Sequence, residues 1–131
     1  MTYYQEQIIR IKNEVYPREY LYLQVRKAKQ YIESHFPENP DLDKMAGVAY
    51  FSKFHFIRLF KSIYGKTPYQ YLVSVRIEKA KQLLRTGTKI SDVCFSVGFG
   101  SLSSFKELFK RYTSSTPASY KNKWNKEKKY Y

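Results

Sequence analysis

The pattern of apolar and polar positions in this chain is helical almost throughout. Between residues 18 and 36, the apolar positions that recur every three or four residues are Leu21, Val25, Ala28, Ile32 and Phe36. Spacing of this kind places side chains on one face of a helix. Because no segment alternates apolar and polar residues persistently enough for a β-strand, the sequence predicts an all-α protein.

Proline, glycine and short polar side chains divide this pattern into separate helices. We expect helices over residues 3–15, 18–36, 52–65, 68–85, 90–97 and 101–112. We also expect a short helix that opens with residues 41–46 and a short last helix from residue 117. Asp41 and Ser52 are candidate N-caps, because their side-chain oxygens can accept bonds from free backbone N–H groups. Pro68 suits a first helical position, and Gly87 suits the end of a helix.

Two stretches of the chain are copies of one another. Residues 56–71 and 105–120 align at a constant offset of 49 residues. The identical pairs are Phe56 with Phe105, Leu59 with Leu108, Phe60 with Phe109, Lys61 with Lys110, Thr67 with Thr116, Pro68 with Pro117 and Tyr71 with Tyr120. A repeat of this length indicates one supersecondary unit used twice, and the predicted elements make that unit a helix-turn-helix.

The repeated helix of the first copy, at about residues 52–64, has two different faces. The stripe expected to face the core is Phe56, Leu59, Phe60 and Ile63, and the opposite face carries Phe54, Ile57, Arg58 and Lys61. Phe54 and Ile57 are either scattered surface hydrophobes, which are common, or groups that touch thymine methyls while Arg58 reaches guanine. The second copy with the same geometry favours the DNA interpretation.

The repeated helix of the second copy, at about residues 101–112, keeps the core stripe and changes the opposite face. Its stripe is Phe105, Leu108, Phe109 and Tyr112, and its other face carries Ser103, Lys106, Glu107 and Lys110. One scaffold that recognises two different base sequences would have this pattern, although drift would also produce it.

The net positive charge of the chain comes from the part that contains the repeat. The net charge is +13, but residues 1–43 hold 6 basic and 7 acidic residues, whereas residues 44–131 hold 18 and 4. Such a field attracts nucleic acid or an anionic membrane. No run approaches the length of a membrane span, and the start lacks the apolar core of a signal peptide. We therefore expect a cytoplasmic protein with no membrane partner.

Candidate catalytic and metal-binding residues are scarce. The chain has one cysteine, Cys94, and two histidines, His35 and His55, which are too few for a metal cluster. No Ser-His-Asp set, glycine-rich phosphate loop or pair of carboxylates stands out, so we predict neither an enzyme nor a cofactor. We interpret His35 as structural, whereas His55 either contacts phosphate or packs internally.

Over about residues 20–122 the chain resembles the DNA-binding region of AraC/XylS-type transcription regulators. The most specific part, Ile90–Tyr120, is similar to the family pattern I-x-D-V-A-x-x-V-G-F-x-S-x-S-x-F-x-x-x-F-K-x-x-x-G-x-T-P-x-x-Y. The first copy adds Ser52–Phe56 and Arg58–Lys61. The helix between the copies adds Arg76, Ala80, Leu83 and Leu84 in the family's R-x-x-x-A-x-x-L-L spacing.

The resemblance implies two helix-turn-helix subdomains joined by one long linker helix, with an extra N-terminal helix. The expected divisions are an N-terminal extension (1–17), a first subdomain (18–67), the linker helix (68–86), a second subdomain (87–122) and a basic tail (123–131). The tail is either a solvated end or a source of phosphate contacts. Residues 1–19 are too short for a small-molecule effector domain, and they either cover the core or dimerise.

The expected DNA-binding residues lie on the two recognition helices. They are Lys53, Phe54, Ile57, Arg58 and Lys61 on the first, and Leu102, Ser103, Lys106, Glu107 and Lys110 on the second. The chain departs from the family at Cys94, where Ala is usual, at Tyr50, where Gly is common, and at Glu107, where many relatives have Arg. A carboxylate repels phosphate but can accept a bond from cytosine.

The resulting prediction is a sequence-specific transcription regulator, in this family more often an activator that touches RNA polymerase. It would insert both recognition helices into successive major grooves on one face of double-stranded DNA, at an asymmetric promoter site. The alternative is a module of the same fold that binds DNA without sequence choice or binds a protein partner. Glu107 and the apolar Phe54 and Ile57 favour that alternative.

Overall fold

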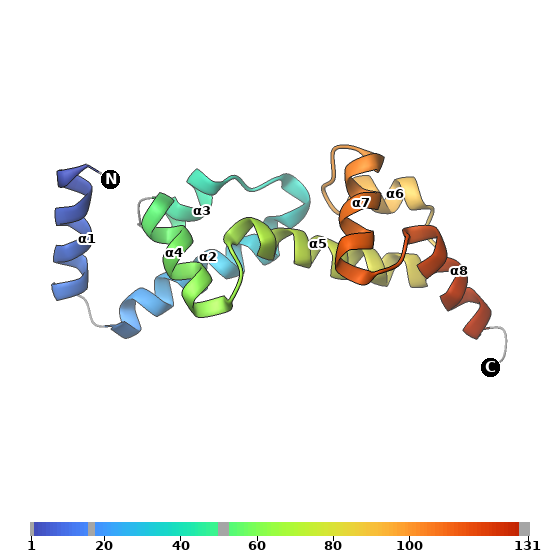
Figure 1. Ribbon diagram of the computed structural model, residues 1–131, viewed down its shortest axis with the longest axis horizontal. Helices are drawn as coiled ribbons and strands as arrows, with labels where there is room; N and C mark the ends of the chain where they lie inside the picture. The colour runs from blue at the N-terminus through green and yellow to red at the C-terminus, as the bar shows by residue number, and fades with distance from the viewer. Residues whose placement is uncertain (1, 16–17, 50–52, 129–131) are drawn as a thin grey trace. The chain divides into compact units, whose positions relative to one another are not determined.

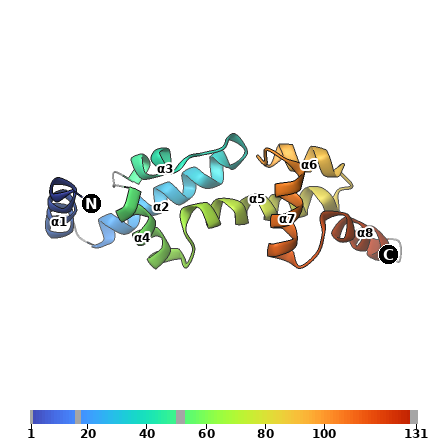
Figure 2. The same cartoon turned by 45° about the horizontal axis from the view of Figure 1, so that its top comes forward.

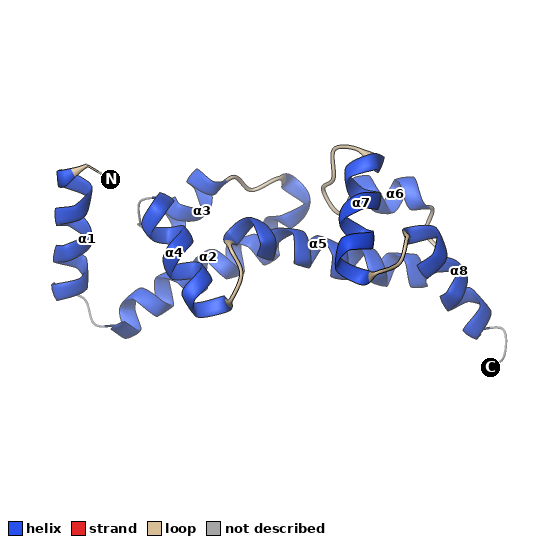
Figure 3. Cartoon of the chain, viewed as in Figure 1, coloured by secondary structure: helices blue, strands red, loops and turns tan. Residues whose placement is uncertain are grey.

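The computed structural model describes residues 2–15, 18–49 and 53–128. Within these ranges the chain consists of helices and their connections, without a strand (Figure 3). The helices are α1 (Tyr3–Val15), α2 (Arg18–His35), α3 (Leu42–Ala49), α4 (Lys53–Tyr64), α5 (Pro68–Arg85), α6 (Ile90–Ser96), α7 (Leu102–Thr113) and α8 (Pro117–Lys128), with a 3-10 turn, Phe36–Glu38, after α2 (Figure 1). The predicted all-α fold is confirmed.

Short polar side chains begin several of these helices. Asp41 Oδ1 accepts a bond from Lys44 N at 2.8 Å, as the sequence predicted. At the start of α5, Thr67 Oγ1 accepts from Gln70 N at 3.2 Å and Gln70 Oε1 accepts from Thr67 N at 3.0 Å. These two bonds form a capping box, which satisfies backbone N–H groups that the helix leaves free. The expected cap at Ser52 lies outside the described residues.

The ends of α4, α5 and α7 use the left-handed backbone conformation. Gly65 and Gly87 follow α4 and α5 with φ of 74° and 86°, a conformation that glycine adopts at little steric cost. After α7 the same place in the repeat is Ser114, which adopts φ 63°. The second copy therefore ends its repeated helix, α7, with a side chain where the first copy has none.

The helices form two compact units, each with its own core. The first unit contains residues 1–35 and 40–72, and the second contains residues 36–39 and 73–131. Helix α5 supplies its residues up to Leu72 to the first unit and those from Val73 onward to the second. Each unit thus combines one copy of the repeat with part of this shared helix.

In the first unit, α2, α3 and α4 pack against one another (Figure 2). The buried apolar side chains of this unit are Val25, Ala28, Ile32, Met45, Ala46, Phe56, Phe60 and Leu72. Phe56 and Phe60 meet edge to face with ring centroids 5.6 Å apart. This packing holds one side of α4 and leaves its other side outward.

The second unit is built around α5 and α7. Its buried cluster is Val73, Ile77, Ala80, Leu84, Val93, Cys94, Val97, Phe99, Phe105 and Phe109. Arg76 is also buried, and its Nε donates to Phe36 O at 2.9 Å while Nη2 donates to Asn39 Oδ1 at 3.2 Å. Gly98, at φ 103°, packs so closely that a Cβ there would lie 2.7 Å from Phe36 O. The short segment after α2 is therefore part of the second unit.

The predicted core stripes are correct at their centres and wrong at one edge. Phe56, Phe60, Phe105 and Phe109 are fully buried, whereas Tyr112 remains 39% exposed. Leu59, Ile63 and Leu108 are half-buried. Each repeated helix packs on one side only. Residues away from the centre of its apolar stripe therefore lie at the edge of the core, where part of the side chain stays exposed.

The last helix is longer than the sequence suggested. We expected a short helix followed by a basic tail, but α8 continues to Lys128. No Gly or Pro follows Pro117, and the lysines in this segment favour helix, so nothing ends it early. Among the described residues, no helix combines the length and apolar character that crossing a membrane requires.

Candidate nucleic-acid interface

The first candidate surface is the outward face of α4. Phe56 and Phe60 fix the helix by one side. At 100° per residue, Phe54, Arg58 and Lys61 lie together on the other side. Phe54 is 61% exposed, and Arg58 and Lys61 are exposed. A large aromatic ring, a guanidinium group and an ammonium group are therefore presented side by side to solvent.

Two of the α4 residues that we expect to contact DNA are less available to a ligand than the others. Ile57 is half-buried, so only part of this side chain is available to a ligand. Lys53 Nζ forms an ion pair with Asp43 Oδ1 of α3 at 3.0 Å. This pair links the start of α4 to α3 and reduces the free positive charge there.

The outward face of α7 is built in the same way. Phe105 and Phe109 are buried, with their ring centroids 5.7 Å apart. The exposed residues of α7 that the sequence predicted are Ser103, Lys106, Glu107 and Lys110. Leu102 is half-buried and packs against the core cluster, so its side chain mainly supports the helix.

An unexpected partner accompanies Glu107. Arg111 Nη2 donates to Glu107 Oε1 at 2.9 Å, and both side chains are largely exposed. Arg111 is not among the residues predicted to contact DNA, although a Glu followed four residues later by Arg is a helix-stabilising pair. Because Arg111 partly neutralises Glu107, the face of α7 is less repulsive to phosphate than its sequence suggested.

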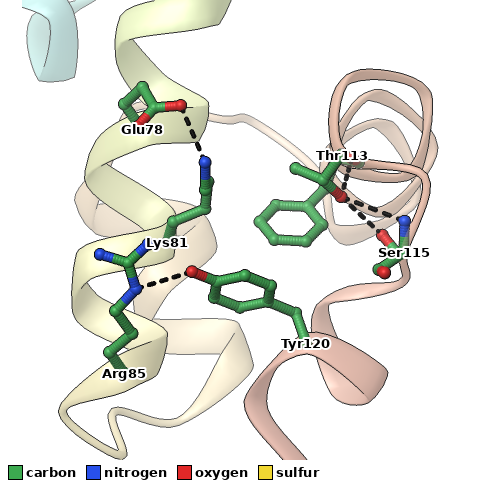
Figure 4. A network of polar contacts seen from close by, with 7 residues as sticks. Glu78, Lys81, Arg85, Thr113, Ser115 and Tyr120 are labelled. Carbon is green, nitrogen blue, oxygen red and sulfur yellow. Dashed lines mark hydrogen bonds and ion pairs between the residues drawn. The ribbon is translucent and has the colours of Figure 1, made fainter. Parts of the chain in front are cut away.

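Polar contacts hold the end of α7 and the start of α8 in the second unit (Figure 4). Thr113 Oγ1 donates to Phe109 O at 2.7 Å and contacts Ser115 O at 3.0 Å. Arg85 Nε donates to Tyr120 Oη at 2.7 Å. The Arg85 guanidinium also lies 5.1 Å from the ring centre of Trp124. These contacts fix the scaffold from which α7 presents its outward face.

The equivalent place in the first unit has a different network. Tyr71 Oη donates to Glu33 Oε1, and Lys29 Nζ pairs with the same carboxylate at 3.0 Å. Lys29 also lies 5.4 Å from the ring centres of Tyr64 and Tyr71. The bond from Tyr71 lowers the pKa of Glu33, and burial raises the pKa of Tyr71. The network joins α2 to the first turn of α5.

His35 and Cys94, the other side chains considered for chemistry, are held within the scaffold. His35 Nδ1 lies 3.0 Å from Tyr31 O, and the two rings stack, which agrees with a structural role. Burial raises the pKa of Cys94, so its thiol stays protonated near neutral pH. Groups of three or more His, Cys, Asp or Glu that could hold a metal ion are absent from the described residues.

Comparison with known proteins places these features in a family. The sequence model described as "Helix-turn-helix domain" matches residues 45–123. The bifunctional transcriptional activator/DNA repair enzyme AdaA of Bacillus subtilis is 34% identical over 102 residues, which cover 77% of this chain and 48% of AdaA. The chain thus spans about half the length of this curated relative.

Solved structures share the arrangement of helices. The DNA-binding domain of the global transcriptional factor AdpA, crystallised with a target DNA, has a TM-score of 0.75 at 28% identity, over 79% of this chain and 95% of that one. The C-terminal domain of AraT, a response regulator from Geobacillus stearothermophilus, has a TM-score of 0.71 at 29% identity, over 76% of this chain and 84% of that one.

Proposed function

The chain belongs to the family of AraC-type helix-turn-helix transcription regulators, and on this premise we propose that α4 and α7 recognise double-stranded DNA in its major groove. The observation that carries the proposal is the repeated geometry. Two copies of one buried scaffold hold outward faces that differ in chemistry. On the outward face of α4, Phe54 and Arg58 are exposed side by side, in the combination that can meet a thymine methyl and a guanine edge.

On α4 we assign the three outward side chains different tasks. Arg58 has the two-pronged donor geometry that suits guanine O6 and N7, and Phe54 can cover a thymine methyl. Lys61 is a point charge suited to a phosphate oxygen. Lys53 is a weaker candidate, because contact with DNA would compete with its pair to Asp43.

On α7 we assign Lys106 and Lys110 to the DNA backbone and Ser103 to a base edge or phosphate. Glu107 has two possible tasks that differ in their consequences. It either accepts from the amino group of cytosine or pairs only with Arg111, to which it is bonded, and repels the DNA backbone. We favour the second alternative, because the ion pair already occupies one carboxylate oxygen.

We further propose that both helices address one DNA face at successive major grooves, and that the site is asymmetric because the two faces differ. Helix α5 supports this proposal, because it is continuous from Pro68 to Arg85 and belongs to both units. AdpA, a structural relative, was crystallised with its target DNA. Action as a transcriptional activator is part of the same proposal, supported by the description of AdaA as a transcriptional activator. An activator of this kind would act in the cytoplasm and contact RNA polymerase.

Selection of binding sites from random double-stranded DNA tests this function directly. We expect one asymmetric motif that retains binding in a mobility-shift assay when unrelated DNA is added in excess. Recovery of no motif, with equal competition by any DNA, would support the alternative of non-specific binding. Failure to bind any duplex at low salt would favour a protein-interaction module of the same fold.

A further inference from the structure

The outward faces of α4 and α7 carry their arginine at different positions. At the repeat offset of 49 residues, Arg58 of α4 corresponds to Glu107 of α7. Ser62 of α4 corresponds to Arg111. Ser62 Oγ donates to Leu59 O of its own helix at 2.8 Å, so α4 presents no cation at this position. The second copy thus has a carboxylate where the first has a guanidinium group, and its own guanidinium group comes four residues later.

Arg111 lies on the same side of α7 as the residues expected to contact DNA. At about 100° per residue, it lies beside Glu107 and away from the buried Phe105 and Phe109. Its side chain is 65% exposed, and its Nη2 atom donates to Glu107 Oε1 at 2.9 Å. A step of four residues along a helix is about 6 Å. The arginine of the second unit is therefore displaced by about that distance toward the end of its helix.

We propose that Arg111 binds a phosphate of the DNA backbone and is the arginine contact of the second unit, as Arg58 is of the first. The inference rests on the proposed recognition of DNA by α4 and α7, and it adds a residue and its target group. In this arrangement the arginine of α4 contacts a base, whereas the arginine of α7 fixes the second unit to the DNA backbone.

The place of Arg111 along α7 favours a phosphate over a base. In a helix-turn-helix, the residues near the N-terminus of the recognition helix contact the base edges. Arg111 lies instead in the last turn of α7, which ends at Thr113. Lys110 is exposed in the same turn, so this turn presents two cations together. Such a pair attracts phosphate oxygens whatever the base sequence is.

The bond to Glu107 also favours a phosphate. An arginine that recognises guanine donates to O6 and N7 with a fork of N–H groups. Glu107 engages Nη2, a terminal nitrogen that this fork uses. A guanidinium group has several other N–H donors, so Arg111 can bond a phosphate oxygen while it keeps Glu107. Because an ion pair between exposed groups contributes little free energy, a phosphate can also displace Glu107 at low cost.

A purely structural role is the alternative for Arg111. A cation in the last turn suits the helix dipole, and a Glu followed four residues later by Arg stabilises a helix. Arg111→Gln and Glu107→Gln break the same ion pair, so a structural role predicts that both change DNA binding in the same direction. A phosphate contact predicts opposite directions, because one variant removes an attractive charge and the other removes a repulsive charge.

Fluorescence anisotropy with selected and scrambled duplexes separates these roles. We expect Arg111→Gln to weaken binding about three- to tenfold on both duplexes and to reduce the slope of log K against log salt by about 0.9, whereas Glu107→Gln tightens binding. Arg111→Lys should keep most of the affinity, because an ammonium group also binds phosphate. Lys27→Gln controls for net charge, since Lys27 is exposed on α2, outside both outward faces. A loss in Arg111→Gln no larger than in Lys27→Gln, or a loss on the selected duplex alone, overturns the inference.

Neutral methylphosphonate groups, introduced one at a time into the selected duplex, locate the phosphate. We expect a position at which neutralisation weakens binding of the wild type but not of Arg111→Gln. Equal sensitivity of the two proteins at every position overturns this inference and leaves the proposed function intact. A wild-type chain that binds no duplex at low salt overturns the proposed function, and this inference with it.

Discussion

Tyr71 and Tyr120 occupy the same place in the two copies of the repeat, but their hydroxyl groups bond side chains of opposite charge. Tyr71 donates to the carboxylate of Glu33, whereas Tyr120 accepts from the guanidinium of Arg85 at 2.7 Å. Both copies thus use a tyrosine at this position, but its hydroxyl group donates in the first copy and accepts in the second. The two units should consequently respond differently to pH.

Tyr71→Phe should destabilise the protein near neutral pH by about 0.5–1.5 kcal/mol, the net range of a typical hydrogen bond in a protein. The bond lowers the pKa of Glu33, so its contribution is present above the ordinary Glu value of about 4.3. It is lost as the pH falls through the lowered value in the folded protein. Urea unfolding at neutral and acidic pH should show the variant and wild type converging in acid.

Tyr120→Phe is the control for this pH effect. Arg85 stays charged throughout the acidic range, so the cost of removing its acceptor should not vary with pH. If Tyr71→Phe also costs the same at both pH values, the Glu33 carboxylate does not stabilise the first unit through this bond.

Arg58→Ala should weaken binding to the selected DNA site by about 1–3 kcal/mol and relax the preference at one base pair. The reason is that Arg58 lies in the middle of the outward face of α4, beside Phe54. Fluorescence anisotropy with selected and scrambled duplexes measures both effects. Lys27→Ala is the control, since Lys27 is an exposed cation of α2 outside the outward faces of α4 and α7. Equal losses on both duplexes would make Arg58 a phosphate contact.

DNA binding should depend strongly on salt, because basic residues displace counterions from phosphates. If the protein neutralises about 6 phosphates, the slope of log K against log salt should be near −5. Titrations at several NaCl concentrations give this slope. A flat dependence up to physiological salt would exclude DNA as the main partner.

Replacing Glu107 with Arg should tighten binding to selected and scrambled DNA alike, because the change removes a repulsive charge and frees Arg111. Glu107→Gln should also tighten DNA binding, but by less, because it removes one charge without adding the opposite one. Both variants are compared with wild type on each duplex by anisotropy. Weaker binding of both variants to the selected site alone would identify Glu107 as a cytosine contact.

Ser114→Gly should stabilise the second unit by about 0.5–1 kcal/mol. Ser114 follows α7 with φ 63°, a left-handed conformation that costs a non-glycine residue about 1–2 kcal/mol. The converse change, Gly65→Ser, should destabilise the first unit by a similar amount. Denaturant midpoints of the two variants test the pair, and a stabilising Gly65→Ser would contradict it.

Helical periodicity was sufficient to predict the all-α fold and the buried centres of α4 and α7. Phe56, Phe60, Phe105 and Phe109 are buried, because the centre of an apolar stripe must face the core whatever packs against it. Periodicity could not assign the edges of the stripes. The exposure of Tyr112 and the partial burial of Ile57 depend on neighbouring helices that a helical wheel does not contain.

Side-chain partners were harder to predict than burial. The Glu107–Arg111 pair follows from local spacing and was available in the sequence. The Lys53–Asp43 pair joins different helices, so its formation depends on the packing of α3 against α4. The assignment of Lys53, Arg58 and the other DNA-binding candidates stays a prediction. Exposure and charge show which side chains can reach DNA, but the geometry of the bound DNA determines which of them make contact.

The bonds of Arg76 have a consequence for dividing the molecule. Its acceptors, Phe36 O and Asn39 Oδ1, come from a segment that lies in the sequence before α3 and α4. The duplicated units are consequently interleaved along the chain and cannot be separated by one cut. A fragment that starts at Val73 would keep the guanidinium and lose both acceptors. Modular exchange of recognition units would therefore have to carry residues 36–39 along with the second one.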